Sequence, residues 1–235
     1  MTSPESFLFG EWIRDLALTR ERVREIVGLA RERCERKRSF PASLDGLRRT
    51  WETGGRHRDR FLASRPESTV RLSRPMIERG LDHFARLLRP DVARSRRASQ
   101  LAGRESKALR AEPLGVVLHV VSGNVFFGPA ESLLAGLLTG NVNLVKRPTE
   151  GGDFLRFFLH SLEEYAPELT ASTALLHWRG GEEAVEEILG RCVDAIVVAA
   201  DSETIASYRR LASPFTALLE FGPRVSVAVV SQAAL

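Results

Sequence analysis

Two polar residues suited to catalysis or cofactor binding stand at the ends of neighbouring apolar runs. Asn124 follows the run Gly115–Val121 in a Ser-Gly-Asn loop, and Lys146 closes the run Val142–Val145. An asparagine amide can stabilise a developing oxyanion. A lysine ammonium is a compact charge that can bind a ribose hydroxyl or a 2′-phosphate, and only three of the 34 basic residues are lysines. We interpret both residues as parts of one cofactor site; a turn residue and a surface lysine are the alternatives.

Glu220 is the third candidate, and it lies in the apolar run Ala217–Phe221. Burial among leucine and phenylalanine side chains would raise the pKa of its carboxyl group, which suits a general base. The alternative is a glutamate at the edge of a sheet that pairs with Arg224.

A fourth candidate position is Ser202, which opens a helical segment after the run Ala195–Ala199. The start of a helix at the carboxyl end of a strand can bind a pyrophosphate. Asp201 or Ser202 would be the N-cap, and because the Asp201 carboxylate would repel such a group, helix capping is the favoured role. No GxGxxG motif follows the first apolar run, which argues against an ordinary dinucleotide-binding dehydrogenase.

The elements that must position these residues alternate between apolar β-branched runs and helical segments. Strands that are apolar throughout, with helices between them, predict a parallel sheet covered on both faces, which is a doubly wound α/β domain over residues 111–235. The expected strands are Gly115–Val121, Val142–Val145, Ala174–Trp178, Ala195–Ala199, Ala217–Phe221 and Val225–Val230.

Residues 1–110 have a different texture. From Phe7 to about Leu88, apolar residues recur at spacings of three and four, which predicts amphipathic helices that cover the sheet. The stretch Arg94–Arg110 is rich in arginine and serine and poor in apolar residues, so we expect a basic linker there.

Composition narrows the class of protein. The 235 residues are 43% hydrophobic and 27% charged, with a formal net charge of +4, which is typical of a globular protein without a nucleic-acid-binding surface. We find no apolar run long enough for a membrane span and no secretory signal, so we expect a cytoplasmic protein. The two cysteines, Cys34 and Cys192, have no metal-binding or disulfide spacing.

Taken together, these residues resemble the aldehyde dehydrogenase superfamily, and within it the LuxC-type acyl-CoA reductases. The superfamily pattern P-x-G-V…N…G-N-x-V-x-x-K-P is matched, with Arg147 inserted before the proline, by Pro113, Gly115, Val116, Asn124, Gly140, Asn141, Lys146 and Pro148. A later Glu-x-Gly-Gly-Lys pattern is matched by residues 220–224.

The resemblance implies NADPH-dependent reduction of a long-chain acyl-CoA or acyl-protein thioester to a fatty aldehyde, through an acyl-cysteine. Asn124 would then hold the carbonyl oxygen and Glu220 would act as the acid/base. The cofactor-binding residues would be Lys146, Arg147, Ser202 and Gly222. A homo-oligomer or an acyl-transferase is the protein partner that the resemblance implies; neither a metal nor nucleic acid is expected.

Two departures from the family pattern matter. The glycine-containing turn before the pyrophosphate helix is replaced by Ala199, Ala200 and Asp201. The nucleophilic cysteine would follow Glu220 by a few tens of residues, so we expect it beyond this chain, which would be truncated before the catalytic domain and inactive alone. Another oxidoreductase of the superfamily, or a non-catalytic remnant that binds nucleotide or a partner, remains an alternative.

Overall fold

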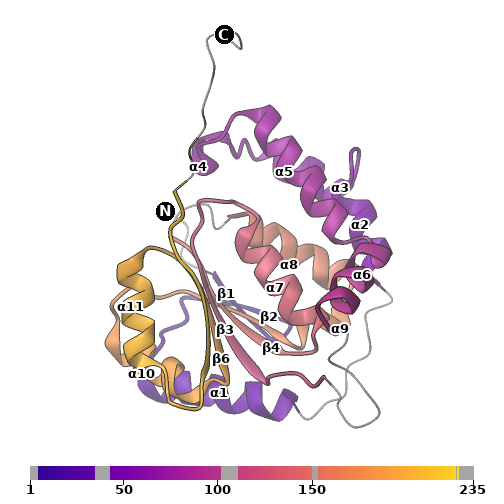
Figure 1. Cartoon of the computed structure of the whole chain (residues 1–235). Coiled ribbons are helices and arrows are strands. Elements are labelled where there is room, and N and C mark those ends of the chain that lie inside the picture. The colour runs from indigo at the N-terminus through magenta and orange to yellow at the C-terminus, as the bar shows by residue number, and fades with distance from the viewer. Residues whose placement is uncertain (1–4, 35–42, 102–110, 150–152, 226, 228–235) are drawn as a thin grey trace.

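The centre of the protein is a seven-stranded sheet with the order β2-β1-β5-β4-β3-β6-β7 (Figure 1). The computed structural model describes residues 5–34, 43–101, 111–149, 153–225 and 227. The parallel strands within them are β3 (Val116–Val121), β4 (Val142–Lys146), β5 (Thr173–Leu176), β6 (Ala195–Ala199) and β7 (Ala217–Phe221). The predicted doubly wound sheet is confirmed. The predicted strand over 225–230 falls largely outside the described residues, and Val225 and Val227 lie in no strand.

The strand order creates a switch point between β3 and β6. From β3 the chain adds β4 and then β5 on one side, and it later adds β6 and β7 on the other. In open α/β sheets, ligands bind beyond the carboxyl ends of the strands at such a point. The loop with Asn124 follows β3, and Ser202 follows β6.

One face of the sheet carries two layers of helices (Figure 1). The layer that touches the sheet contains α7 (Gly128–Leu138), α8 (Asp153–Tyr165) and α9 (Pro167–Thr170). Helices α2, α3 and α5 pack on this layer and share its apolar core. The outer elements are α2 (Leu44–Trp51), α3 (Arg56–Ala63), α4 (Glu67–Val70), α5 (Arg74–Leu87) and α6 (Pro90–Leu101).

The other face carries a single layer of helices around a second apolar core (Figure 1). These helices are α1 (Arg20–Cys34), α10 (Glu183–Cys192) and α11 (Ser202–Leu211). Because successive side chains of a strand point to opposite faces, each parallel strand serves both cores. In β3, Leu118 belongs to the core under α1 and α10, whereas His119 points toward α7.

The N-terminal segment differs from the helix that we predicted to begin at Phe7. Residues 5–14 form an antiparallel hairpin of β1 (Glu5–Leu8) and β2 (Glu11–Arg14), and β1 pairs with β5. The two turn residues, Phe9 and Gly10, have φ values of 52° and 111°. Positive φ at both positions is what a two-residue hairpin turn requires. The prediction of a helix was therefore wrong for these residues, and the hairpin extends the sheet at one edge.

The predicted basic linker is also wrong over its first half. Helix α6 continues to Leu101, and residues 102–110 lie outside the described part of the chain. From Asp91 to Leu101 the chain is charged, but it contains no glycine or proline that would interrupt a helix. Arg96 of α6 pairs with Glu131 of α7 at 3.3 Å, which joins the outer helices to the inner layer.

Candidate functional site

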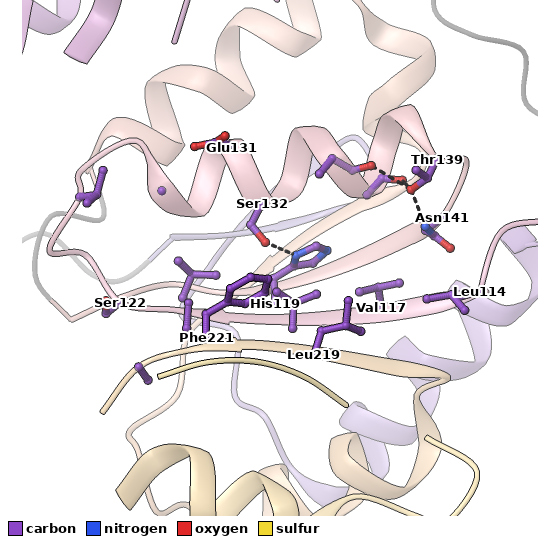
Figure 2. A pocket seen from close by; sticks show the side chains of 18 of the residues that line it. Leu114, Val117, His119, Ser122, Glu131, Ser132, Thr139, Asn141, Leu219 and Phe221 are labelled. Atoms are coloured by element: carbon purple, nitrogen blue, oxygen red, sulfur yellow. Dashed lines mark hydrogen bonds between the residues drawn. The ribbon is translucent and has the colours of Figure 1, made fainter. Parts of the chain in front are cut away.

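A cavity of about 1020 Å³ lies between α7 and the strands β3, β6 and β7 (Figure 2). We call it the α7 cavity. Near the carboxyl end of β3 it is lined by Ser122 and Asn124, and Gly222 borders it after β7. Most of its lining is apolar, and the apolar side chains include Leu114, Val117, Val121, Val125, Leu219 and Phe221.

A buried histidine, His119, is one of the polar residues in the cavity wall. His119 Nδ1 lies 2.7 Å from Ser132 Oγ (Figure 2). Its Nε2 lies 3.0 Å from Asn143 Oδ1. The Asn143 amide nitrogen donates to the carbonyl oxygen of Asn141, so Asn143 Oδ1 is the acceptor that faces His119. The hydrogen-bond network thus assigns the proton to Nε2, and Ser132 donates to Nδ1. Burial lowers the pKa of His119 to about 4, so the ring is neutral near pH 7.

The close approach of α7 to the sheet depends on Gly136. A Cβ at this position would lie 1.9 Å from Asn143 Oδ1 and 3.1 Å from His119 Nε2. Both distances are shorter than ordinary van der Waals contact, so only glycine leaves room for the histidine network. The network and the position of the helix are therefore coupled.

Asn124 is exposed at the rim of the α7 cavity. Its loop is held to the neighbouring strand by the Ser122 backbone N–H, which donates to the Ala199 carbonyl at 2.9 Å. Phe126 is 1% exposed and packs against Phe61 and Phe154 in the helical core. The aromatic residues after Asn124 therefore anchor the loop, and the amide remains accessible.

Lys146 lies on the opposite face of the sheet, beside α10. Its Nζ is 3.2 Å from Glu186 Oε1 and 4.9 Å from the centre of the Trp178 ring. Strand β4 determines this side, because Val142 and Leu144, two and four residues earlier, belong to the core under α1 and α10. The Lys146 side chain is 16% exposed. Its ammonium is thus held at the margin of the core by a buried carboxylate.

Further positive charge gathers at the carboxyl ends of β4 and β5. Arg147 follows Lys146 and pairs with Asp153 at 3.5 Å. The pKa of His177 is lowered by burial and then by the charges of Arg147 and Lys146. His177, which we expected inside a strand, is exposed in the loop after β5. This loop and the end of β4 form a cationic edge that suits an anionic ligand.

The start of α11 has the cap that the sequence predicted. Asp201 accepts a hydrogen bond of 2.7 Å from the backbone N–H of Thr204, which lowers the pKa of Asp201. Ser202 is the first residue of α11 and is exposed. The Asp201 carboxylate therefore occupies part of the helix N-terminus where a pyrophosphate would otherwise bind.

The pKa of Glu220 is shifted in the opposite direction from the one we expected. Both of its carboxylate oxygens accept hydrogen bonds from the Arg209 guanidinium of α11, one of them at 2.8 Å. These bonds lower the pKa of Glu220. The residue is exposed on β7, whose far side has no paired strand among the described residues, so burial is too slight to raise the pKa. Its partner is Arg209, where the alternative had named Arg224.

The predicted residues thus fall into two groups. Asn124 and Gly222 border the α7 cavity, whereas Lys146 and Glu220 point to the other face of the sheet, so among the described residues Lys146 does not share this cavity with Asn124. The sequence reasoning missed Glu186. Its signal was a glutamate directly after Val185 on the buried side of an amphipathic helix.

Neither cysteine lines the α7 cavity. Cys34 ends α1 and is exposed, and Cys192 ends α10 and is partly buried. Within the described residues, no three histidine, cysteine or acidic side chains come together as a metal site. A search of the same residues for a helix long and apolar enough to cross a membrane finds none.

The fold is the first feature that relates this chain to known proteins. Solved aldehyde dehydrogenases share it, among them an enzyme of Bartonella henselae with a TM-score of 0.70 and 12% identity over 94% of this chain and 52% of that one. Another is the NADP-dependent glyceraldehyde-3-phosphate dehydrogenase of Bacillus halodurans, complexed with NADP, with a TM-score of 0.68 and 19% identity over 94% of this chain and 53% of that one. At these identities, the likeness establishes the fold alone.

The family follows from the sequence. The model of the acyl-CoA reductase (LuxC) family matches residues 71–235, and the chain belongs to this family. It is 24% identical over 125 residues to long-chain acyl-protein thioester reductase 2 of Photobacterium leiognathi, and 22% identical over 125 residues to the corresponding reductase of Aliivibrio fischeri. Each match covers 52% of this chain and 26% of the relative, so the chain spans only part of these relatives.

Proposed function

We propose that this chain supplies the cofactor-binding domain and the carbonyl-binding amide of a reductase that converts long-chain acyl thioesters, on coenzyme A or on a protein, to fatty aldehydes with NADPH. The observation that carries the proposal is the exposed Asn124 amide at the mouth of a mainly apolar cavity. The cavity volume of about 1020 Å³ is at the upper end for small-molecule sites, which gives room for an acyl chain.

Asn124 would bind the carbonyl oxygen of the thioester. Oxygen gains negative charge when the carbonyl carbon is attacked, and an amide donor held in place beforehand stabilises that charge without reorganising. The hydrogen bond from Ser122 to β6 and the buried Phe126 fix the loop that presents the amide. Because His119 is neutral near pH 7, no imidazolium would compete with the Asn124 amide for the carbonyl oxygen.

The cationic edge fits the phosphorylated ribose of NADPH. Lys146 and Arg147 at the end of β4 would present donors and positive charge to a 2′-phosphate. Ser202 at the start of α11 and Gly222 after β7 would approach the rest of the dinucleotide. When bound, NADPH would supply the hydride that reduces the carbonyl carbon. The neighbouring folds crystallised with NADP support a nicotinamide cofactor.

The test is acyl-CoA-dependent oxidation of NADPH by the product of the full reading frame that encodes this chain. Asn124→Ala should lower kcat by about 10²–10³-fold because the oxyanion loses its donor. Asn124→Asp keeps the shape, replaces the donor with a carboxylate, and should be at least as slow. NADPH binding and the unfolding temperature should stay unchanged in both variants. Full activity of Asn124→Ala would refute the role of the amide.

A second candidate function is the binding of nucleotide or of a partner without catalysis. It is favoured by the position of Cys34 and Cys192, neither of which lines the α7 cavity. Tight NADPH binding without any acyl-CoA-dependent oxidation, in the full reading frame, would establish it. Assays with acyl phosphates and free aldehydes would separate the thioester reductase from other oxidoreductases of the superfamily.

A further inference from the structure

Glu186 gathers three hydrogen bonds on one carboxylate oxygen. Its Oε1 accepts from Lys146 Nζ at 3.2 Å, from Trp178 Nε1 at 3.1 Å and from the Tyr208 hydroxyl at 3.1 Å. The Glu186 side chain is 6% exposed. Burying a carboxylate to this degree has a large desolvation cost. A buried carboxylate is therefore retained only where hydrogen bonds and an opposite charge compensate that cost.

The three donors come from different elements. Lys146 ends β4, Trp178 lies in the loop after β5, and Tyr208 lies in α11. Burial, followed by the Glu186 charge, raises the pKa of Tyr208, so its hydroxyl keeps its proton and donates. The geometry therefore fixes Lys146 against α10 with its charge largely neutralised.

We propose that Glu186 determines how this chain discriminates between a dinucleotide with a 2′-phosphate and one with a 2′-hydroxyl. The inference rests on the proposed role of Lys146 at the cofactor ribose. A carboxylate near the ribose favours a 2′-hydroxyl, which can donate to it, whereas a cation favours a 2′-phosphate. Glu186 combines both effects, because it engages the ammonium and adds a negative charge beside it.

The surrounding charges make this carboxylate decisive. Beside Lys146, the arginines among the described residues at the ends of β4 and β5 are Arg147 and Arg179, and Arg147 is already paired with Asp153. A phosphate that approaches Lys146 must draw the ammonium away from Glu186 or share it. Glu186 thus opposes the cationic edge and weakens its preference for NADPH.

The experiment measures the dissociation constants of NADPH and NADH by calorimetry for the unmodified chain, Glu186→Gln and Glu187→Gln. Glutamine keeps an acceptor for Trp178 and Tyr208 and removes the charge. The ratio of NADH to NADPH dissociation constants should rise about tenfold in Glu186→Gln, because one repulsive charge is removed near the phosphate. Glu187, next in α10, pairs with Arg20 and Arg191 at the surface, so its variant should leave the ratio unchanged. An unchanged ratio in Glu186→Gln would overturn the inference.

Tyr208→Phe keeps the inference testable if Glu186→Gln does not fold. It removes one donor from Glu186 without changing a charge, so the carboxylate should hold Lys146 more strongly and shift the ratio toward NADH. No shift, or a shift toward NADPH, would overturn the inference.

Lys146→Ala separates this inference from the proposed function. If Lys146→Ala weakens NADPH binding but neither Glu186→Gln nor Tyr208→Phe changes the ratio, only the discrimination by Glu186 is wrong. If the unmodified chain binds neither dinucleotide, or if Lys146→Ala changes nothing, the proposed cofactor site itself fails.

Discussion

The two faces of the sheet hold buried polar groups of different kinds. Under α7, His119, Ser132 and Asn143 form a neutral network beside an apolar cavity. Under α10, Lys146 and Glu186 form an ion pair close to the carboxyl edge. A neutral network that is fully hydrogen-bonded has no unpaired polar group that an apolar ligand would have to cover. A charged pair, in contrast, contains a cation that can bind an anionic ligand. Under the proposed function, the face under α7 would hold the acyl chain and the face under α10 the phosphorylated nucleotide.

The largest effect that would break this arrangement is expected at Gly136. Gly136→Ala places a Cβ 1.9 Å from Asn143 Oδ1, so α7 or the network must move. We expect the free energy of unfolding to fall by about 3 kcal/mol, the upper range for an overpacked core. Urea denaturation measures it.

Gly28→Ala is the matched control for Gly136→Ala. Gly28 also lies in a helix, and a Cβ there meets nothing within 4 Å. Since alanine has the higher helix propensity, this variant should be neutral or more stable, by up to about 1 kcal/mol. Equal losses in the two variants would show that the approach of α7 to the network is not the constraint.

A second, smaller effect tests whether the network under α7 is neutral. Histidine has a pKa of about 6.5 in an unfolded chain, and burial lowers that of His119 to about 4. The unfolded chain therefore binds this proton more tightly, and the free energy of unfolding decreases as the pH falls from about 6.5 to about 4. Between pH 7 and pH 5, His119 should account for a loss of about 2 kcal/mol.

The measurement for His119 is urea denaturation at both pH values, for the unmodified chain and for His119→Gln. The glutamine variant has no proton to gain at this position, so its unfolding free energy should depend less on pH. Parallel pH profiles for the two proteins would contradict a neutral, buried His119.

The smallest expected effect is at the exposed ion pair between Arg209 of α11 and Glu220 of β7. Arg209→Gln removes the guanidinium that lowers the pKa of Glu220, so this pKa should return toward its ordinary value. A carbon-detected NMR titration of the glutamate carboxyls would measure the change. Arg210→Gln, one residue further along α11, is the control. A Glu220 pKa that stays low in Arg209→Gln would mean that another group stabilises its charge.

Much of the α/β part could be predicted from the sequence. The runs Ala195–Ala199 and Ala217–Phe221 coincide with β6 and β7. Burial explains the apolar run of β6, whereas β7 is apolar although it is largely exposed in the described residues. The Asp201 cap was predicted for a similarly local reason. Family motifs supplied the remaining assignments, including Asn124 and Lys146.

What could not be predicted depends on contacts between distant segments. Phe9 and Gly10 form a turn in a hairpin whose strand β1 pairs with the distant β5, whereas the spacing of apolar residues alone predicted a helix. Lys146 was placed by the end of its strand, but the face to which it points follows from the position of Val142 and Leu144 in the core. The pKa of Glu220 depends on Arg209 of α11, which comes close to β7 only in the folded chain.

The hairpin at the start of the chain has a consequence for the order of folding. Its side chains reach far along the sequence: Glu5 pairs with Arg156, 151 positions away, and β1 bonds only to β2 and β5 in the sheet. During synthesis, β1 must wait until β5 has emerged before it can pair with it. Contacts of such long range slow folding and leave the free edge of β1 exposed until then.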